Sequence, residues 1–511
     1  PSLPVMRPVA HSIFWLICLA ASVAAAGDYS LVISNGRVID PETGLDAIRH
    51  VGIRGDRIAR VSTEALEGDR EIDAAGLVVA PGFIDLHTHS PTALGQYFQL
   101  MDGVTTALEL EAGAFPVGEY GGEIHQAPLS HFGASAGYLS MRLLVKDGLA
   151  VPDATASPWP VGVKGWWTAA RAVFAGRDAA LARTFTEPAT PDERERLRSM
   201  LHEELDRGAL GIGLALDYVS EAVDEDELAM ILDVAGQRQA PVFVHVRRGI
   251  NGDPAGLREV LALAERASAP LHVCHISHNG MKNTELFLSE IRAARARGVD
   301  VTTEVLPYNA GSTLISAAVF GRDWQTIFDI TYEDVEWAAT GERFDEAMWE
   351  EYRRRHPSGA VIHHYLEEAW TRRAIAEPGV MIVSDLLAMK SREEHVPPHN
   401  GAFARILGRY VREEPVLDLM TALSKMTLLP ARRLERHAPV FRRKGRLQEG
   451  ADADLTIFDP ETVIDRATYR DPYQESAGIA HVLVSGVLVV EDGALVEAVH
   501  PGRRLEARAR E

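Results

Sequence analysis

Two histidines stand two residues apart in the segment APGFIDLHTHS, which contains His87 and His89. The apolar residues before them predict a β-strand, and alternate residues of a strand point to the same face. Two imidazoles that leave one face together at the end of a strand can bind one divalent metal ion. Such pairs are often chance surface pairs, but the preceding Pro-Gly-Phe-Ile-Asp favours a metal site at the end of a buried strand.

The next strand-like segment, GVTTALELEAG, carries two acids with the same spacing, Glu109 and Glu111. A buried carboxylate is costly unless it is paired with a cation or binds a metal. Glu111 is nearer the end of the strand, so we expect it to be the main or bridging carboxylate ligand, with Glu109 as the alternate. A salt bridge to a neighbouring strand is the other interpretation for whichever acid is not a ligand.

Three further candidates follow buried strand-like segments in the middle of the chain. His245 is the second-last residue of PVFVHV, His275 ends LHVCH and Asp385 ends VMIVSD. Helical patterns alternate with these segments, and the clearest is predicted to be capped by Asp253. Parallel strands that are apolar on both faces must be covered on both sides. The pattern therefore predicts an α/β fold, a (β/α)8 TIM-like barrel, with the candidates at its catalytic carboxyl end.

Short alternating segments at both ends of the chain predict further strands, and Asn35-Gly36 indicates a tight turn between two of them. We expect one small β-sandwich domain built from both chain ends, residues 27–79 and 437–511. The metal-dependent barrel is expected at 80–436. A segment at about 309–379, rich in Trp, Tyr and acids, is too long for an ordinary βα connection and predicts a helical insertion over the barrel mouth.

Residues 1–26 have the pattern of a secretory signal peptide. Arg7 precedes an apolar run that begins at Ile13, and small residues follow up to Ala26. The run is shorter than the roughly 20 residues of a membrane span, so an N-terminal anchor is the less favoured alternative and no span is expected after cleavage. We expect export, to a bacterial periplasm. Cys18 lies in this leader, so the mature chain would keep Cys274 alone and no internal disulfide.

The composition limits the class of partner. Of the 511 residues, 46% are hydrophobic and 24% are charged, which is an ordinary globular composition. The formal net charge of −21, with no block of basic residues, argues against a nucleic-acid partner because phosphate binding needs a cationic face. A small-molecule amide substrate is the expected partner, and the sequence leaves a homo-oligomer open.

The segments PGFIDLHTHS, GVTT, KGRLQEGADADLTIFDP and PGRRL resemble the amidohydrolase superfamily. Within it, GALGIGLALDY, FVHVR, DVTTEVLPYNAGST, RILGRYVREE and KMTLLPARRL are similar to the D-aminoacylase (N-acyl-D-amino-acid deacylase) family. The resemblance runs from about Tyr29 to Arg504. It implies a zinc enzyme with one or two ions, in which His245 and His275 are ligands and Asp385 is both ligand and catalytic residue.

The resemblance also implies a mechanism. Hydroxide activated by the metal attacks an amide carbonyl, and Asp385 takes up a proton and returns it to the leaving nitrogen. The second strand departs from the best-known members, which carry a metal-bridging cysteine where this chain has Ala112, directly after Glu111.

Substrate recognition departs from the family as well. The resemblance implies that Tyr218 and Tyr308 donate hydrogen bonds to a substrate carboxylate. Two family cations are missing, because Ser277 stands where the family often has lysine and the loop EHVPPHNGAF contains no arginine. A charge-assisted contact is worth roughly 1.5–3 kcal/mol, so this pocket is predicted to bind a free carboxylate weakly. Possible substitutes for the missing cations are His278, His395 and His399.

The leading hypothesis is an exported zinc amidase that hydrolyses the linear amide bond of an N-acyl amino acid. A cyclic-amide or dipeptide hydrolase of the same superfamily is the first alternative, and products from linear and cyclic substrates would separate the two. A binding protein with an idle metal-binding barrel is the alternative from another class. It is disfavoured because the four histidines and Asp385 are all present.

Overall fold

The computed structural model describes residues 28–122, 124–151, 182–357, 359–393 and 396–507. The predicted signal peptide and His395 lie outside these residues, and both stay predictions. Among the described helices, none combines the length and the apolar character that crossing a membrane requires.

Eight parallel strands follow one another in chain order around the centre of the molecule. Two backbone hydrogen bonds join the first and last strands: Asp385 N–H donates to His87 O at 2.8 Å and His89 N–H donates to Leu386 O at 2.7 Å. The predicted (β/α)8 barrel is confirmed. Its strands are β6 (Phe83–Asp85), β7 (Val104–Ala114), β8 (His131–Gly137), β9 (Ile212–Leu214), β10 (Val242–Val244), β11 (Leu271–Val273), β12 (Val301–Val305) and β17 (Val380–Ile382).

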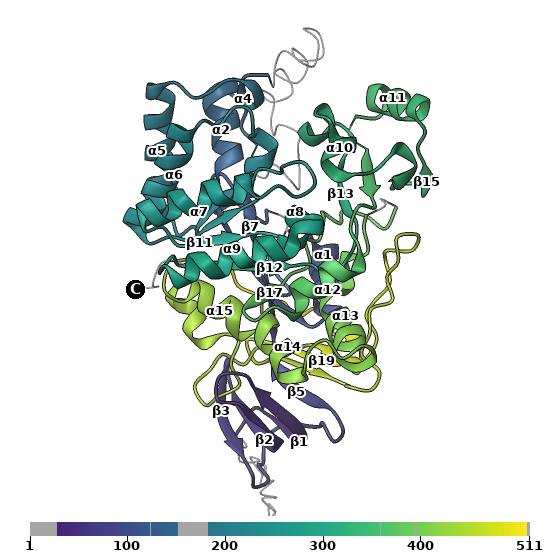
Figure 1. Cartoon of the computed structure of the whole chain (residues 1–511). Helices are drawn as coiled ribbons and strands as arrows, with labels where there is room; N and C mark the ends of the chain where they lie inside the picture. The colour runs from purple at the N-terminus through teal and green to yellow at the C-terminus, as the bar shows by residue number, and fades with distance from the viewer. Residues whose placement is uncertain (1–27, 123, 152–181, 358, 394–395, 508–511) are drawn as a thin grey trace, which may run out of the picture.

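Helices connect these strands and pack around the sheet (Figure 1). The helix predicted to be capped by Asp253 is present as α7 (Ala255–Ala267), but its N-cap residue is Pro254; Asp253 precedes the cap and accepts the N–H of Ala255 at 2.8 Å. The described helices around the barrel are α1 (Ala93–Met101), α2 (Tyr138–Asp147), α4 (Ala182–Thr186), α5 (Pro191–Asp206), α6 (Glu225–Arg238), α7 (Ala255–Ala267), α8 (Ile276–Gly280), α9 (Thr284–Ala296), α12 (Glu368–Ala376), α13 (Ala402–Arg405), α14 (Leu419–Met426) and α15 (Leu428–Leu434).

A nine-stranded sheet contains strands from both ends of the chain, as predicted, and lies at the lower end of the molecule in Figure 1. The antiparallel pairing of β5 with β18 joins the two ends. The strands are β1 (Leu31–Asp40), β2 (Leu45–Arg54), β3 (Arg57–Ser62), β4 (Glu71–Asp73), β5 (Val78–Pro81), β18 (Leu455–Phe458), β19 (Ile479–Val484), β20 (Val487–Glu491) and β21 (Ala494–Leu495).

The tight turn predicted at Asn35-Gly36 is wrong. Strand β1 runs through both residues, and they form a bulge in its pairing with β2, with Asn35 at φ +61°. A Cβ on Gly36 would lie 2.5 Å from the Val79 side chain. The glycine therefore permits close packing against β5 at a bulge rather than a chain reversal.

The segment between β12 and β17 is not the purely helical insertion that the sequence predicted. It contains a four-stranded antiparallel sheet, whose β13 and β15 stand with α10 and α11 at the upper right of Figure 1. Its aromatic residues, which include Trp324 and Trp349, form a separate hydrophobic core. The elements are β13 (Gly311–Leu314), α10 (Trp324–Phe328), β14 (Val335–Trp337), β15 (Glu342–Arg343), α11 (Glu346–Arg355) and β16 (Ala360–His363).

Candidate metal centre and active site

Six side chains singled out in the sequence converge where β6, β7, β10, β11 and β17 end. These residues form groups of three that share members, for example Glu111 with His245 and His275. Within each group the possible ligand atoms lie within 4.8 Å of one another. The Asp385 side chain is 22% exposed, whereas the other five are at most 8% exposed. The six are His87, His89, Glu111, His245, His275 and Asp385.

Glu111 occupies the centre of this cluster. Its Oε1 lies 3.0 Å from His245 Nδ1 and 2.8 Å from His275 Nε2. Its Oε2 lies 3.1 Å from His87 Nε2 and 3.5 Å from His89 Nε2. One carboxylate therefore faces two separate pairs of imidazoles, which is the position that a bridging ligand needs.

Glu109 does not lie between the imidazole pairs. It contacts the Nδ1 atom of a histidine ring whose Nε2 atom faces Glu111. Its Oε2 is 2.6 Å from His89 Nδ1, and Glu304 on β12 is likewise 2.6 Å from His87 Nδ1. A carboxylate oxygen accepts, so each Nδ1 carries a ring proton and each Nε2 is left to bind a metal ion or a second proton. The two Nε2 atoms are 3.2 Å apart and lie 3.3–3.4 Å from Asp385 Oδ1. Lone pairs that converge in this way require a positive charge between them.

The electrostatics of the cluster also favour a cation. Burial disfavours an imidazolium, yet the carboxylates around His87 and His89 raise the pKa of both rings well above its ordinary value. Burial alone would raise the pKa of Glu111 and of Asp385, but the neighbouring histidines hold both below their usual range. The two carboxylates are therefore ionised at neutral pH, and the site attracts positive charge.

Two of the cluster residues have left-handed backbone conformations. His275 has φ +30° and Asp385 has φ +51°, values that non-glycine residues rarely adopt. Each such residue costs about 1–3 kcal/mol and persists where the surrounding structure fixes it, which is most often at a functional site. At Asp385 the backbone bond to His87 O fixes the conformation and turns the carboxylate toward the histidine pair.

Three of the predicted pocket residues lie next to the cluster. The Tyr218 ring centre, in the 3-10 helix Leu216–Val219, is 5.6 Å from that of His245. The His278 ring centre is 6.1 Å from that of His275, and His278 Nε2 is buried without a hydrogen-bond partner among the described residues. His399 Nδ1 donates to the backbone oxygen of Asp385 at 3.0 Å.

The fourth, Tyr308, is not in contact with the metal cluster. Its ring stacks on His399 with centres 4.8 Å apart, and the Arg405 guanidinium lies 5.0 Å from the ring centre. The residue is 3% exposed. Its role as a donor to substrate stays a prediction.

Several polar residues near the site were not singled out in the sequence. Glu304 has a visible signal, since it is a charge within the buried segment VTTEV, and Arg248 follows His245 closely in HVRR. Arg322 and Tyr365 belong to the insertion and reach the mouth, where Arg322 pairs with Asp217 at 3.1 Å. The sequence predicted that the insertion lies over the mouth but not which of its side chains face the site, so these contacts could not be predicted.

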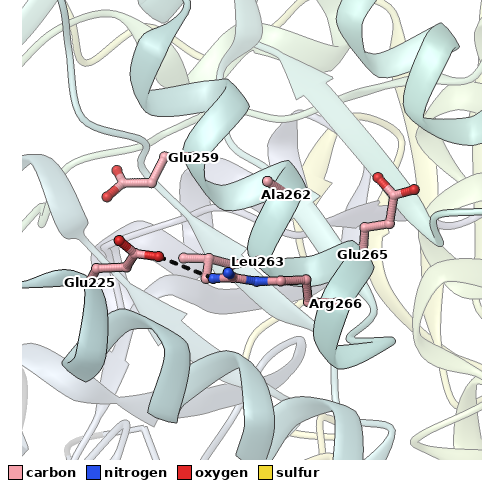
Figure 2. Close-up of a pocket in the computed structure, with 6 residues that line it drawn as sticks. All are labelled: Glu225, Glu259, Ala262, Leu263, Glu265 and Arg266. Carbon is pink, nitrogen blue, oxygen red and sulfur yellow. Dashed lines mark hydrogen bonds and ion pairs between the residues drawn. The ribbon is translucent and has the colours of Figure 1, made fainter.

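A surface groove of about 370 Å³ lies elsewhere, on the outside of the barrel (Figure 2). Its lining includes an ion pair between Arg266 and Glu225 at 3.2 Å. No member of the histidine cluster lines it, so it is not the place where the cluster would meet a substrate.

The model of the Amidohydrolase family matches residues 372–490 of this chain. An N-acyl-D-glutamate deacylase from Alcaligenes xylosoxydans xylosoxydans is 34% identical over 481 residues, which cover 90% of this chain and 93% of the relative. A D-aminoacylase from the same organism is 30% identical over 94% of this chain and 98% of its own length. The chain belongs to the D-aminoacylase family of amidohydrolases. It is a hydrolase that acts on carbon–nitrogen bonds other than peptide bonds, as predicted.

Solved structures agree with this family. An N-acyl-D-glutamate deacylase from Bordetella bronchiseptica, crystallised with zinc and a phosphonate mimic of the tetrahedral intermediate, superposes with a TM-score of 0.72 at 26% identity. The match covers 94% of this amidohydrolase and 99% of that chain. A D-aminoacylase structure superposes with a TM-score of 0.73 at 24% identity and supports the fold.

Proposed function

We propose that this amidohydrolase is a zinc-dependent deacylase that hydrolyses the linear amide bond of an N-acyl amino acid. The observation that carries the proposal is the position of Glu111, whose two oxygens face two separate imidazole pairs. Relatives at 34% and 30% identity are an N-acyl-D-glutamate deacylase and a D-aminoacylase, and a solved relative holds zinc. These relatives support the substrate class and the metal.

The donor set fits zinc, since imidazole nitrogens and carboxylate oxygens are its usual ligands. Metal-binding histidines generally donate their second ring N–H to a carboxylate, and Glu304 and Glu109 accept such bonds from His87 and His89. Glu111, His245 and His275 would hold one ion. A second ion would share Glu111 and take as its other ligands His87, His89 and Asp385.

A bound divalent ion polarises a carbonyl and lowers the pKa of water. The chain itself contributes proton transfer by Asp385. Its side chain is the most exposed of the six, and its lowered pKa keeps it ionised and able to accept a proton from the attacking water. Asp385 then donates that proton to the leaving nitrogen, because an amine leaves poorly without it.

The test combines zinc loading with the variant Asp385→Asn. The ligand group of Glu111, His245 and His275 does not include Asp385, so the variant should keep zinc there and lose about 10²–10⁴-fold in turnover. Asp492→Asn, at a position that is 88% exposed, is the matched control. Zinc-bound Asp385→Asn that works at the unmodified rate would refute the assigned role.

The substrate panel contains N-acetyl derivatives of D- and L-amino acids together with cyclic amides. Stripping zinc with a chelator should abolish hydrolysis, and adding zinc back should restore it. Release of acetate from the linear substrates supports the proposal. Ring opening without any acetate release would instead favour the cyclic-amide alternative.

We also propose that residues 1–26 direct export, on the strength of Arg7 and the short apolar run that follows it. Fusing this segment to a leaderless alkaline phosphatase, which needs periplasmic disulfides to be active, tests the proposal. An inactive fusion that accumulates in the bacterial cytoplasm would contradict it.

A further inference from the structure

Arg248 lies at the mouth of the barrel, three residues after His245. Its guanidinium carbon is 5.1 Å from the centre of the Phe328 ring and 5.9 Å from the centre of the Tyr365 ring. Both rings come from the segment between β12 and β17, and the Tyr365 hydroxyl donates to the backbone oxygen of His278 at 3.3 Å. Aromatic faces attract a guanidinium and limit its movement, so the cation is held in place above the cluster.

This guanidinium has donors without partners. Its Nε is buried and has no hydrogen-bond partner among the described residues. Its Nη2 contacts Asn279 Oδ1 at 3.5 Å, the limit of a hydrogen bond, and no carboxylate of the described residues forms an ion pair with it. Since an arginine carries five N–H donors in a planar fork, most of this fork is free for a ligand.

The neighbouring arginines differ in that each forms an ion pair with a carboxylate. Arg247 pairs with Glu259 at 2.9 Å. Arg322 contacts both oxygens of Asp217, at 3.1 and 3.3 Å, and Asp217 also accepts the backbone N–H of Arg248 at 2.9 Å. Asp217 thus has its direct ion-pair partner in Arg322, although the charge of Arg248 also helps to lower its pKa.

The charge of Arg248 is maintained next to the cluster. Burial lowers its pKa, but Tyr365, Asp217, Tyr218 and Glu111 together raise it above the ordinary arginine value. Glu111 belongs to the cluster, so the guanidinium lies within electrostatic range of the cluster. A fixed cation with free donors stands beside the place where the amide bond would be cut.

We propose that Arg248 binds the α-carboxylate of the N-acyl amino acid. This inference rests on the proposed function. In such a substrate the carboxylate is attached to the carbon that carries the leaving nitrogen, so its binding site must adjoin the cluster, as Arg248 does. A guanidinium fork matches a carboxylate in bidentate fashion. The family often has a lysine where this chain has Ser277, and the absence of that lysine led to the prediction of weak carboxylate binding. Arg248 supplies a cation in its place.

The experiment compares N-acetylmethionine with N-acetylmethioninamide, in which a neutral amide replaces the carboxylate. Acetate release by the zinc-loaded full chain gives kcat/KM for each enantiomer. The unmodified enzyme should prefer the carboxylate substrate by about 10–150-fold, the range expected of a charge-assisted contact. Arg248→Gln should lose that factor on the carboxylate substrate and change by less than about threefold on the amide.

Two further variants separate recognition from structure. Arg248→Lys keeps a point charge without the fork, so it should retain part of the preference. Arg258→Gln removes a charge at a side chain that is 55% exposed and paired with Glu290, and it should leave the preference intact. Thermal melting and zinc content of each variant report whether it is folded.

An equal loss on both substrates in folded Arg248→Gln would overturn the inference, because a purely structural arginine affects both alike. So would an unmodified enzyme that hydrolyses both substrates without preference. If the zinc-loaded enzyme released acetate from neither substrate, the proposed function itself would fail. The two failures are therefore distinguishable.

Discussion

The two carboxylates that hold the histidine pair should respond differently to the same substitution. Glu109 accepts from His89 Nδ1 at 2.6 Å, from Ala112 N at 3.1 Å and from Gly113 N at 3.4 Å. Glu304 contacts His87 Nδ1 at 2.6 Å and His272 Nε2 at 2.8 Å. Changing either glutamate to glutamine keeps the shape and replaces one accepting oxygen by a donating NH2 group.

At Glu304 the change can be accommodated. The glutamine oxygen accepts from His87, and its NH2 donates to His272, which shifts its own proton to Nδ1 and donates to Thr302 Oγ1 at 2.7 Å. The variant keeps both hydrogen bonds but loses the negative charge that strengthens them. Hydrogen bonds to ionised groups are about twice as strong as those between neutral groups. We expect zinc binding to weaken about tenfold, or ~1.4 kcal/mol.

At Glu109 the same change cannot be accommodated. One oxygen of the carboxylate serves His89 and the other serves two backbone N–H groups, and backbone donors have no alternative tautomer. The new NH2 group must therefore face a donor on one side. The additional buried, unsatisfied donor costs about 1–3 kcal/mol, so we expect zinc binding to weaken by about a hundredfold or more.

Competition with a chromophoric chelator measures the zinc dissociation constant of each variant. Glu336→Gln, which changes a buried glutamate of the insertion sheet, controls for the loss of a buried carboxylate. Equal weakening in Glu109→Gln and Glu304→Gln, or a larger effect at Glu304, would refute the donor-counting explanation.

Two other substitutions test the cluster and the base of the barrel. Glu111→Ala removes the oxygens that face both imidazole pairs, so zinc retained after dialysis should fall by more than about a hundredfold, beyond the effect of changing an orienting residue. Asp454→Asn removes the nearer of two carboxylates that pair with Lys444 Nζ, at 2.6 Å, and leaves Asp452 at 3.1 Å, so urea unfolding at pH 7 should show a loss of about 1–3 kcal/mol. Burial raises the pKa of Asp454, but Lys444 and His131 lower it well below its unfolded value, so its stabilisation is present above about pH 4 and declines in more acidic solution. The deficit of the variant should therefore shrink toward pH 3, and a deficit independent of pH would contradict this account.

The barrel and the place of the site followed from the sequence because both depend on local patterns. His87 and His89 had to share one face of a strand, and buried segments ending in His245, His275 and Asp385 had to end at the same edge of a parallel barrel. Such reasoning needs no knowledge of how distant segments pack.

The sequence favoured Glu111 over Glu109 because Glu111 is nearer the end of the strand, but the geometry that separates the two glutamates depends on packing. Glu109 and Glu111 share a face by their spacing, but the pairing of β7 with β8 shifts register between Glu109 and Ala114, and Gly113 has φ +66°. This bulge places Glu111 between the imidazole pairs and leaves Glu109 outside them. No local pattern in GVTTALELEAG marks where the register changes.

Recognition at the mouth was beyond sequence reasoning for a similar reason. The direct ion-pair partner of Asp217 is Arg322, seventy-four positions further along the chain than Arg248. The rings that hold Arg248 belong to the insertion, whose sheet the sequence did not predict. Charge balance at a pocket is a property of the assembled fold, so a missing family cation at Ser277 could not by itself decide how a carboxylate is bound.

The seam between β6 and β17 couples closure of the barrel to its chemistry. The two backbone bonds at the seam come from Asp385 and His89, which are themselves members of the cluster. The buried Asp85 carboxylate accepts the N–H groups of His87 and Ser384 at 3.2 Å each, and so fixes both strand ends in one register. A slip of one residue would turn the cluster side chains to the opposite face. The pairing that closes the barrel is therefore the same pairing that brings the proton acceptor to the histidine pair.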